Sequence, residues 1–380
     1  MNKIELCDRT KCTQCLACVM KCPKQCITME TSEAGFSIPS INREICIECG
    51  LCMQACHQIA SVSLNRRIPS VGYAAWNLDD KIRCLSSSGG IFSAFAENII
   101  RKGGIVFGAA YVTGLKVKHI GVETVSELQI LRGSKYIQSD IGNSYQEVRN
   151  NLQNDRLVLF TGSPCQVAGL YVFLKKSYDN LYTCDFICHG VPSQKSFDIY
   201  REKIRLPQSG ITNFGFRDTK RWGFKMSLDG IPLPLVDTYY LKAFSKGYMF
   251  MESCYSCQYA TVQRITDITM ADFWGLGDKI LFNHPKHKGV SLLLINTAKG
   301  ETLTQECADS LFLEERTLEE AIQGNYNLSH ASLRPIERNT YYEDSIRLSK
   351  CELIRKYKLF PSWRDYLRPL KKALQSLYQK

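Results

Sequence analysis

The residues best able to do chemistry in this sequence are its 18 cysteines, ten of which fall within the first 56 residues. Two runs share one spacing, CTQCLACVMKC from residue 12 and CIECGLCMQAC from residue 46. C-x2-C-x2-C-x3-C is a bacterial spacing for two 4Fe–4S clusters, in which the fourth cysteine of each run serves the other cluster. The predicted ligands are Cys12, Cys15, Cys18 and Cys56 for one cluster, and Cys46, Cys49, Cys52 and Cys22 for the other.

Zinc and disulfides are the weaker interpretations of these runs. Zinc sites usually show two separated cysteine pairs, and structural disulfides are rare in a reducing compartment. Cys7 and Cys26 lie outside the ligand set and are predicted to be small packing residues. His57 stands where a proline often follows the run, and we expect the change to matter little, because the proline is not a ligand. A domain of this kind carries electrons. Its attachment to a larger chain predicts an internal electron-transfer path, or wire, that leads into the rest of the protein.

Four later cysteines are expected to meet at one edge of a sheet. The segments LVLFTG, SPCQVAGLYVFLKK, NLYTCDFIC and HGVPSQKSFDIYREKI alternate strand and helix, which predicts parallel strands joined by right-handed crossovers. Chemistry in such sheets gathers at the carboxyl ends of the strands. Cys165 and Cys188 fall at these ends, and Cys254 and Cys257 form a C-x-x-C pair in SCYSC.

The residues alone leave four interpretations of this second group open. Cys165 and His189 could form a nucleophile and base, and Cys254 and Cys257 could form a thioredoxin-like redox pair. The four thiolates could instead bind zinc, or a third 4Fe–4S cluster. The third cluster is favoured, because an electron wire should lead to another redox centre.

Two polar segments are candidates for binding an anionic cofactor. SSSGG at residues 86–90 opens an amphipathic helix, and free amides at a helix start suit a phosphate, although Ser87 or Ser88 could simply cap the helix. RGSKYIQSDIG at residues 132–142 could hold an anion through Ser134 and Lys135, or be a solvated loop. No G-x-G-x-x-G occurs, so a Rossmann dinucleotide site has no support.

Composition limits the remaining function classes. The formal net charge is +11, but each 4Fe–4S cluster on four thiolates carries about −2, so three clusters would leave about +5. We therefore predict no nucleic-acid partner. No apolar run is long enough to span a bilayer and the first residues lack a signal-peptide pattern, so a cytoplasmic location is expected. Residues 66–82, with Pro69 and Gly72, are predicted to be a linker.

The last segment of the chain is strongly basic. Residues 347–380 hold ten Lys or Arg against two Asp or Glu, interleaved with Tyr357, Phe360, Trp363, Tyr366 and Leu370. The favoured interpretation is a helix that packs on the core with a solvated basic face. The alternative is weak contact with an anionic membrane surface.

A series of motifs resembles one known family in order and in spacing. These are SSSGG (86–90), GSKYIQS (133–139), TGSPCQVAGL (161–170), ICHGVPS (187–193), FRDTKRWGF (216–224), SCYSC (253–257) and DITMADFWGLG (267–277). They resemble the beta-subunit family of coenzyme F420 hydrogenases and dehydrogenases, with the N-terminal dicluster domain that bacterial members often carry. The resemblance covers residues 1 to about 300.

The resemblance implies a flavoprotein oxidoreductase in which FAD exchanges electrons through iron–sulfur clusters. It implies a third 4Fe–4S cluster on Cys165, Cys188, Cys254 and Cys257. It places flavin contacts at Ser87, Ser88, Gly89, Gly90, Gly133, Ser134, Lys135, Tyr136, Gln138 and Ser139. Related members act on a deazaflavin or a chlorophyll derivative, and bacterial members look like accessory enzymes of cell-surface polysaccharide synthesis.

The expected fold is α+β and multidomain, with a ferredoxin-like dicluster domain at 1–65. An α/β flavin-binding body with a mainly parallel sheet follows in two parts, 66–156 and 157–300, before a helical basic region at 301–380. A ferredoxin-type or flavodoxin-type protein is the expected electron donor or acceptor, and a small molecule the substrate. The alternative is an electron-transfer subunit without its own substrate. Lys135, His189 and Arg217 are weak candidates for anion holders or proton donors.

Overall fold

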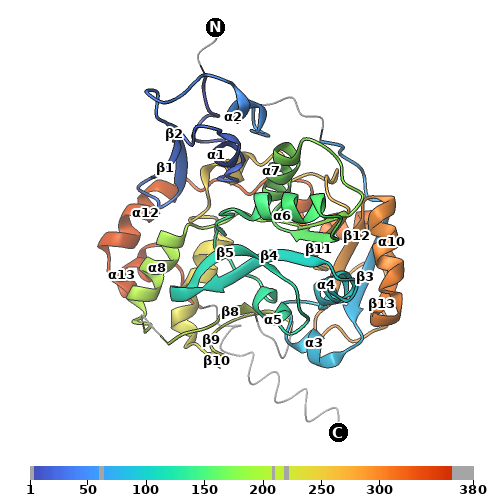
Figure 1. Ribbon diagram of the computed structural model, residues 1–380. Helices are drawn as coiled ribbons and strands as arrows, with labels where there is room; N and C mark the ends of the chain where they lie inside the picture. Colours follow the sequence, from blue (N-terminus) through green and yellow to red (C-terminus); the bar gives the residue numbers. More distant parts are fainter. Residues whose placement is uncertain (1–3, 60–63, 208–209, 218–221, 362–380) are drawn as a thin grey trace.

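The computed structural model describes residues 4–59, 64–207, 210–217 and 222–361. A small N-terminal domain lies on top of a larger body that is built around one sheet (Figure 1). The predicted α+β, multidomain fold is therefore confirmed.

The N-terminal domain consists of a hairpin and two short helices. β1 (Ile27–Thr31) pairs antiparallel with β2 (Ser37–Ile41), with Ile27 opposite Ile41. The helices α1 (Ala17–Lys21) and α2 (Leu51–Gln54) each follow the first cysteines of one run. Because α1 packs against α7 (Pro164–Leu174) of the body, the first cysteine run lies at the junction between the two parts.

The body contains an eight-stranded mixed sheet in the order β13-β3-β12-β11-β7-β6-β4-β5. β4, β6, β7 and β11 form parallel neighbours at its centre, while the other neighbouring pairs are antiparallel. The predicted parallel arrangement thus holds where the cysteine motifs are, and antiparallel strands extend the sheet on both sides. The strands are β3 (Val71–Asn77), β4 (Ile105–Val112), β5 (Lys116–Val122), β6 (Val158–Thr161), β7 (Leu181–Phe186), β11 (Ile268–Asp272), β12 (Ser291–Ile295) and β13 (Leu311–Arg316).

Helices cover both faces of this sheet, as the alternation of buried residues along the strands requires. Val106 belongs to the core under α4 (Ile91–Arg101) and α10 (Ala298–Glu306). Phe107, the next residue, belongs to the core under α6 (Ser144–Gln153) and α7. Figure 1 shows α6 and α7 between the sheet and the N-terminal domain. The face that carries α7 is therefore the one that receives the cysteine-rich domain.

A second, smaller sheet packs beside the main one with an aromatic core. Phe197, Phe214 and Tyr240 are almost fully buried in it. Its strands are β8 (Phe214–Arg217), β9 (Phe224–Leu228) and β10 (Ile231–Pro232), and its helices are α8 (Gln194–Lys203), α9 (Tyr239–Ser245), α12 (Arg338–Arg347) and α13 (Lys350–Lys356). The remaining short helices are α3 (Asp80–Cys84), α5 (Leu128–Leu131) and α11 (Leu318–Gly324).

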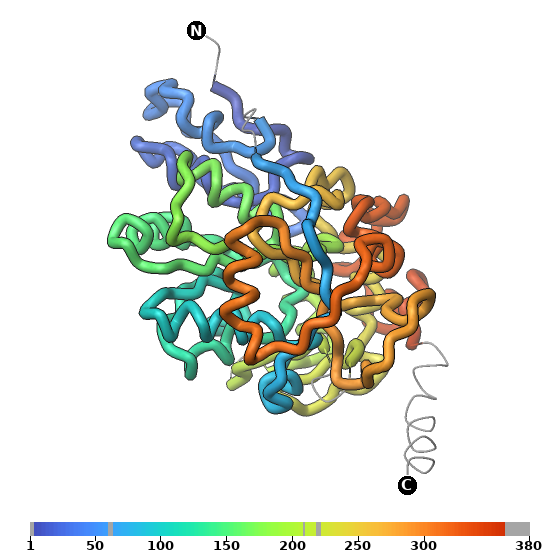
Figure 2. Tube along the Cα trace, turned by 90° about the vertical axis from the view of Figure 1, so that its right-hand side faces the viewer, coloured from blue at the N-terminus to red at the C-terminus, as the bar shows by residue number. Residues whose placement is uncertain are grey.

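The prediction of a linker at residues 66–82 is wrong. Its middle part is β3, which pairs with β12 on one side and with β13 on the other. Figure 2 shows this blue strand running down from the N-terminal domain beside orange segments from late in the chain. Pro69 lies just before the strand, where it disturbs no hydrogen bond of the ladder. Gly72 lies inside β3 and was misread as a turn signal.

Residues 301–380 are not only helical, because they supply the edge strand β13. The region is bound to the body by α10, α12 and α13, and Leu353 and Ile354 are buried in the aromatic core. Of the tail residues singled out in the sequence, Tyr357 is buried and Phe360 is exposed. Trp363, Tyr366 and Leu370 lie outside the described residues, so the proposed membrane contact stays a prediction.

No helix in the described part of the chain combines the length and the apolar character needed to cross a bilayer.

Candidate functional site

The structure brings the cysteines of the N-terminal runs together in the crosswise sets that the spacing predicts. One hollow is lined by Cys12, Cys15 and Cys18 of the first run together with Cys56 of the second. A second hollow is lined by Cys46, Cys49 and Cys52 together with Cys22. We call these the first set and the second set. Each fourth cysteine has crossed to the other run, as a dicluster domain requires.

The two cysteine runs share the same backbone geometry. Gln14 and Leu16 in the first run have φ of 57° and 59°, and Glu48 and Gly50 at the same positions of the second have 52° and 72°. Left-handed residues let each run curve tightly. In the first run the N–H groups of Gln14, Ala17 and Val19 donate to the sulfurs of Cys12, Cys15 and Cys18. Such donors stabilise thiolates, which is the form that binds iron.

Cys7 and Cys26 each accompany one of these sets. The thiol of Cys7 contacts those of Cys12 and Cys56, and these contacts, followed by burial, raise the pKa of Cys7. Cys26 Sγ lies 3.3 Å from Cys22 Sγ, and the N–H of Cys26 donates to the same sulfur. Both cysteines are therefore neighbours of predicted ligands, which their positions in the sequence did not indicate.

Cys165, Cys188, Cys254 and Cys257, which we call the third set, converge at the carboxyl ends of β6, β7 and β11. Cys165 is at the start of α7, just after β6, and Cys188 follows β7. Cys254 and Cys257 come from a short 3-10 turn, Glu252–Ser256, and the residue after it. The structure thus gathers the four cysteines that sequence analysis assigned to one site.

The thiols of the third set interact electrostatically with one another in a buried environment. Burial, and then the charges of the neighbouring thiols, raise the pKa values of Cys165 and Cys188 to about 12. The same two causes raise the pKa of Cys254. Four such groups hold their protons unless a positively charged centre lies between them. The set therefore suits a metal cluster better than a free nucleophile.

The other interpretations of the third set gain little from the structure. Cys165 Sγ lies 3.2 Å from Ser163 Oγ, whereas the charges that act on His189 are those of Asp272 and Arg217. Nothing therefore pairs Cys165 with His189 as nucleophile and base. Within the described ranges, no three His, Cys, Asp or Glu side chains lie together as ligands of a single metal ion. A tetrahedral zinc ion with ligands at about 2.0–2.3 Å thus has no preformed site, and a cluster of four irons must space its ligands more widely.

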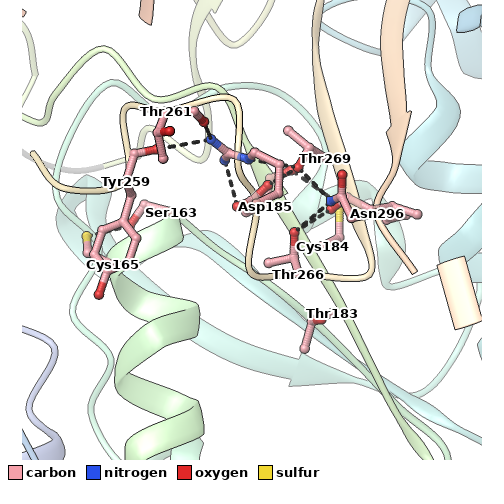
Figure 3. Close-up of polar contacts among 12 residues, drawn as sticks. Ser163, Cys165, Thr183, Cys184, Asp185, Tyr259, Thr261, Thr266, Thr269 and Asn296 are labelled. Atoms are coloured by element: carbon pink, nitrogen blue, oxygen red, sulfur yellow. Dashed lines mark hydrogen bonds and ion pairs between the residues drawn. The ribbon is translucent and has the colours of Figure 1, made fainter. Parts of the chain in front are cut away.

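A buried ion pair fixes the cysteine loop to the sheet. Arg264 Nη2 lies 2.7 Å from Asp185 Oδ2, and the Asp185 and Arg264 side chains are 0% and 2% exposed. Arg264 also donates from Nη1 to the carbonyl oxygens of Tyr259 and Thr261, at 3.1 and 3.2 Å. Thr269 donates to the other carboxylate oxygen of Asp185 (Figure 3). Asp185 precedes Cys188 by three residues, so the network ties the segments that carry Cys188 and Cys257 to each other.

The first and third sets meet across α7. A Cβ atom on Gly169 would lie 2.7 Å from Cys15 Cβ and 3.0 Å from Cys15 Sγ. Gly169 is one helical turn beyond Cys165 and on the same side of α7. The charge of Cys165 also contributes to the raised pKa of Cys15, after burial as the main cause. The cluster predicted on the first set therefore adjoins the third set, whereas Cys49 of the second set is exposed.

The segment 133–139 passes several parts of the candidate site in turn. The Ser134 N–H donates to Ser87 Oγ at 2.7 Å, which joins this loop to the SSSGG segment. Tyr136 OH accepts from Arg217 Nη1 at 3.3 Å. Gln138 donates from its side chain to the Thr13 carbonyl at 3.4 Å, next to the first set. The loop is thus an ordered connection rather than a solvated loop.

Lys135 and Ser139 have structural partners that explain their presence. Lys135 Nζ donates to three carbonyls at the end of α5, at 2.9 to 3.1 Å, and burial lowers its pKa to about 7. Ser139 Oγ lies 2.8 Å from His119 Nδ1 and 2.9 Å from Gln166 Nε2. Neither side chain is arranged to hold an anion.

The serines of SSSGG do not cap the helix that follows. α4 begins after Gly90, which has φ of 79° and offers no side-chain cap. Ser88 donates to the Val290 carbonyl, and Gly89 approaches β3 so closely that a Cβ would lie 2.3 Å from the Ala75 oxygen. The capping alternative is therefore wrong, and this close packing explains the glycine at position 89.

Arg217 belongs to an aromatic group beside His189. It binds Asp272 through both terminal nitrogens, at 2.5 and 2.9 Å. Trp222 donates to the same carboxylate, and its ring stacks on Trp274 at 4.8 Å with an angle of 2°. The motifs FRDTKRWGF and DITMADFWGLG supplied these residues, but the sequence singled out Arg217 alone. The contact between the two tryptophans could not be read from either motif by itself.

Acidification should destabilise the body through His119. His119 Nε2 lies 2.9 Å from the Thr161 carbonyl, which can only accept, so Nδ1 accepts from Ser139. Burial lowers the pKa of His119 from 6.5 to about 4. Between pH 6.5 and 4 the His119 side chain is therefore protonated in the unfolded chain but neutral in the folded chain. The free energy of unfolding falls as pH drops through this range. In His119→Gln this loss should shrink by on the order of 3 kcal/mol, which denaturant unfolding at pH 7.5, 5.5 and 4.5 would measure. An equal loss in both proteins would contradict the assignment.

His57 has a defined place, against the expectation that it would matter little. Its ring is buried between Thr13 of the N-terminal domain and Tyr259 of the body, at 2.9 and 2.7 Å. Burial lowers its pKa to about 4. Sequence reasoning missed this residue because its partner Tyr259 is 202 positions away.

Two family models match parts of this chain. Residues 155–321 match the family model for the C terminus of the coenzyme F420 hydrogenase/dehydrogenase beta subunit. Residues 11–60 match the 4Fe–4S dicluster domain. These two matches confirm the recognition made from the sequence motifs. No curated protein matches the chain. One similar solved structure is a chain of the F420-reducing nickel–iron hydrogenase complex from Methanosarcina barkeri, with 17% identity, a TM-score of 0.46, and coverage of 76% of this chain and 92% of that chain.

Proposed function

We propose that this chain, in which a 4Fe–4S dicluster domain precedes a C-terminal domain of the coenzyme F420 hydrogenase/dehydrogenase beta-subunit type, is a three-cluster flavoprotein oxidoreductase. It receives electrons from a ferredoxin-like donor and passes them to FAD and a small-molecule substrate. The observation that carries this proposal is the contact of Cys15 with Gly169, one turn from Cys165, because it joins the first and third sets directly.

The third set has the chemistry that a 4Fe–4S cluster needs. Its thiols are buried, and N–H groups lie beside them: Gly190 donates to Cys188, and Tyr259 and Ala260 donate to Cys257. Hydrogen bonds to the sulfurs and exclusion of water are the means by which a protein tunes such a centre. The side chains of Met251, Phe36 and Tyr342 pack around Cys254 and keep water from that side.

The flavin-binding residues are proposed to be a smaller set than the sequence suggested. Ser87 and Ser134 are in contact, and a Cβ on Gly133 would meet no atom within 4 Å. Tyr136 of the same loop accepts from Arg217, whose charge acts on His189, the residue after Cys188. These small residues are proposed to hold the flavin, with Tyr136 and Arg217 connecting them to the third set. When bound, a flavin converts between one-electron and two-electron transfer.

One observation favours the alternative, a relay subunit without its own substrate. Arg217 is fully engaged by Asp272, and Lys135 by three carbonyls, so neither candidate is free to bind an anionic substrate. Steady turnover of a small molecule by the isolated chain would support the enzyme, and its absence beside normal electron uptake would support the relay. The substrate, a link to polysaccharide synthesis and a cytoplasmic location remain predictions.

Assays of iron, sulfide and flavin on anaerobically purified protein test the proposal. Three clusters require about 12 irons per chain, whereas the dicluster domain alone requires about 8. About 12 irons with bound FAD would support the proposed function. About 8 irons would rule out the third cluster. Absence of bound flavin would rule out the assignment as a flavoprotein.

Gly169→Ala should separate the first set from the third. The added methyl group would meet Cys15 Cβ and the Tyr145 hydroxyl, both at 2.7 Å, so the N-terminal domain, Tyr145 or α7 must shift. We expect a loss of about 1–3 kcal/mol in stability, as for other overpacked sites. Electron transfer from the dicluster domain to the third set should slow, while the iron content stays unchanged. Rapid-mixing spectroscopy with a reduced ferredoxin would measure the rate, and a wild-type rate would contradict the contact.

A further inference from the structure

We propose that His57 and Tyr259 form a hydrogen-bond bridge that seats the dicluster domain on the body with the first set facing the third. Both are positioning residues. The inference rests on the proposed function, because the two sets must be held together for electrons to pass between their clusters. It concerns a contact that neither the cysteine spacing nor the family motifs specify.

The bridge connects segments that carry the predicted cluster ligands. His57 directly follows Cys56, and its Nε2 lies 2.9 Å from the hydroxyl of Thr13, which directly follows Cys12. On the other side, His57 Nδ1 lies 2.7 Å from the hydroxyl of Tyr259, two residues beyond Cys257. The His57 ring therefore links the two cysteine runs, next to Cys12 and Cys56, to the loop that carries Cys257 of the third set.

Both side chains are buried, so water does not compete for these hydrogen bonds. His57 is 6% exposed and Tyr259 is 3% exposed. The Tyr259 ring packs against Ala168 and Cys165 of α7, and Figure 3 shows Tyr259 beside Cys165. If the two groups separated, each would keep only a longer contact with a neighbouring amide, Gln258 Nε2 to the Tyr259 hydroxyl at 3.4 Å and Gln58 Nε2 to His57 Nδ1 at 3.3 Å. The shorter buried hydrogen bond would be lost. The contact is thus selective for one position of the domain.

The bridge continues into the rigid part of the body. The Tyr259 carbonyl accepts from Arg264 Nη1 at 3.1 Å, and Arg264 is paired with Asp185 in the sheet. On the surface, Arg66 Nη1 donates to the Gln258 carbonyl at 2.9 Å, and Gln258 Nε2 lies 3.4 Å from the His57 carbonyl. The domain is therefore anchored to the strand ends on which the third set stands.

The bridge explains why this chain has His57 at the position where a proline often follows the cysteine run. A proline has no side-chain group that could bond Thr13 or Tyr259. In this chain it would remove the 2.7 Å partner of the buried Tyr259 hydroxyl and leave only the 3.4 Å contact of Gln258 Nε2. The residue after the last cysteine thus serves the junction between the two parts rather than the exit of the chain alone.

The test compares Tyr259→Phe and His57→Phe with Tyr171→Phe in the full-length, cluster-loaded protein. Tyr171 also carries an inward hydroxyl, bonded to Thr183 Oγ1 at 2.7 Å, but this partner lies in the body. Hydrogen exchange of residues 12–22, whose helix α1 packs against α7 and which hold none of the three substituted residues, reports on the junction. Magnetic interaction between reduced clusters, seen by electron paramagnetic resonance, reports on how close the clusters are.

We expect the first two variants to keep their iron but to exchange faster at the junction by roughly threefold to tenfold, the factor that one hydrogen bond contributes. Their cluster–cluster magnetic interaction should weaken, and Tyr171→Phe should leave both signals at wild-type values. Unchanged exchange and interaction in Tyr259→Phe would overturn the proposal, as would an equal effect of Tyr171→Phe. If the wild type held only about 8 irons, the proposed function would fail, while junction exchange would still test the bridge.

Discussion

Replacing Cys165 with serine should lower the iron content from about 12 to about 8 per chain, because one 4Fe–4S cluster is lost. Cys165 is at the start of α7, where it interacts electrostatically with the other three thiols of its set. A serine hydroxyl is a poor substitute for a thiolate on iron. Substrate reduction driven by a ferredoxin-type donor should then disappear. Iron and sulfide assays together with the visible spectrum measure the change.

A matched variant separates cluster loss from general damage. Cys307 is also a buried cysteine of the body, but it lies in the core under α4 and α10, away from the three sets. Cys307→Ala should keep about 12 irons and should lose only the stability expected for a small core truncation. If both variants held the same amount of iron, Cys165 would not be a ligand.

Asp185→Asn should cost about 3–5 kcal/mol in the free energy of unfolding, because it leaves the buried charge of Arg264 without its partner. The ion pair is fully shielded, at 2.7 Å, and the same guanidinium holds the carbonyls of Tyr259 and Thr261. We therefore expect the loop of Cys254 and Cys257 to loosen and the third cluster to become labile. Denaturant unfolding under anaerobic conditions measures the stability loss.

Asp80→Asn provides the comparison for this substitution. Asp80 binds Lys288 at 2.6 Å, but its side chain is 65% exposed. Exposed ion pairs contribute little, so the unfolding midpoint should hardly change. Equal stability of the two variants would show that the Asp185–Arg264 pair does not hold the fold together.

Sequence reasoning succeeded where chemistry depends on local spacing. The cysteine runs predicted their crosswise sets because three of four ligands lie within one short loop. The convergence of Cys165 with Cys188 followed from the rule that parallel strands end at one edge of a sheet. Both predictions needed only residue types and the order of strands and helices.

The errors arose where the partner is distant in sequence. Residues 66–82 looked like a linker, since β12 and β13, which make this segment a strand, come more than 200 residues later. His57 looked unimportant because its partner Tyr259 is 202 positions away. Its role depends on Tyr259 and on how the two parts dock.

The central claim is that electrons reach the flavin through the third set, and one rapid-mixing experiment tests it. Wild-type protein and Cys165→Ser would each be mixed anaerobically with a reduced ferredoxin while the flavin absorbance is followed. The proposal predicts flavin bleaching in the wild type, and reduction of the N-terminal clusters without flavin bleaching in the variant. Flavin reduction at the wild-type rate in Cys165→Ser would contradict the path through the third set.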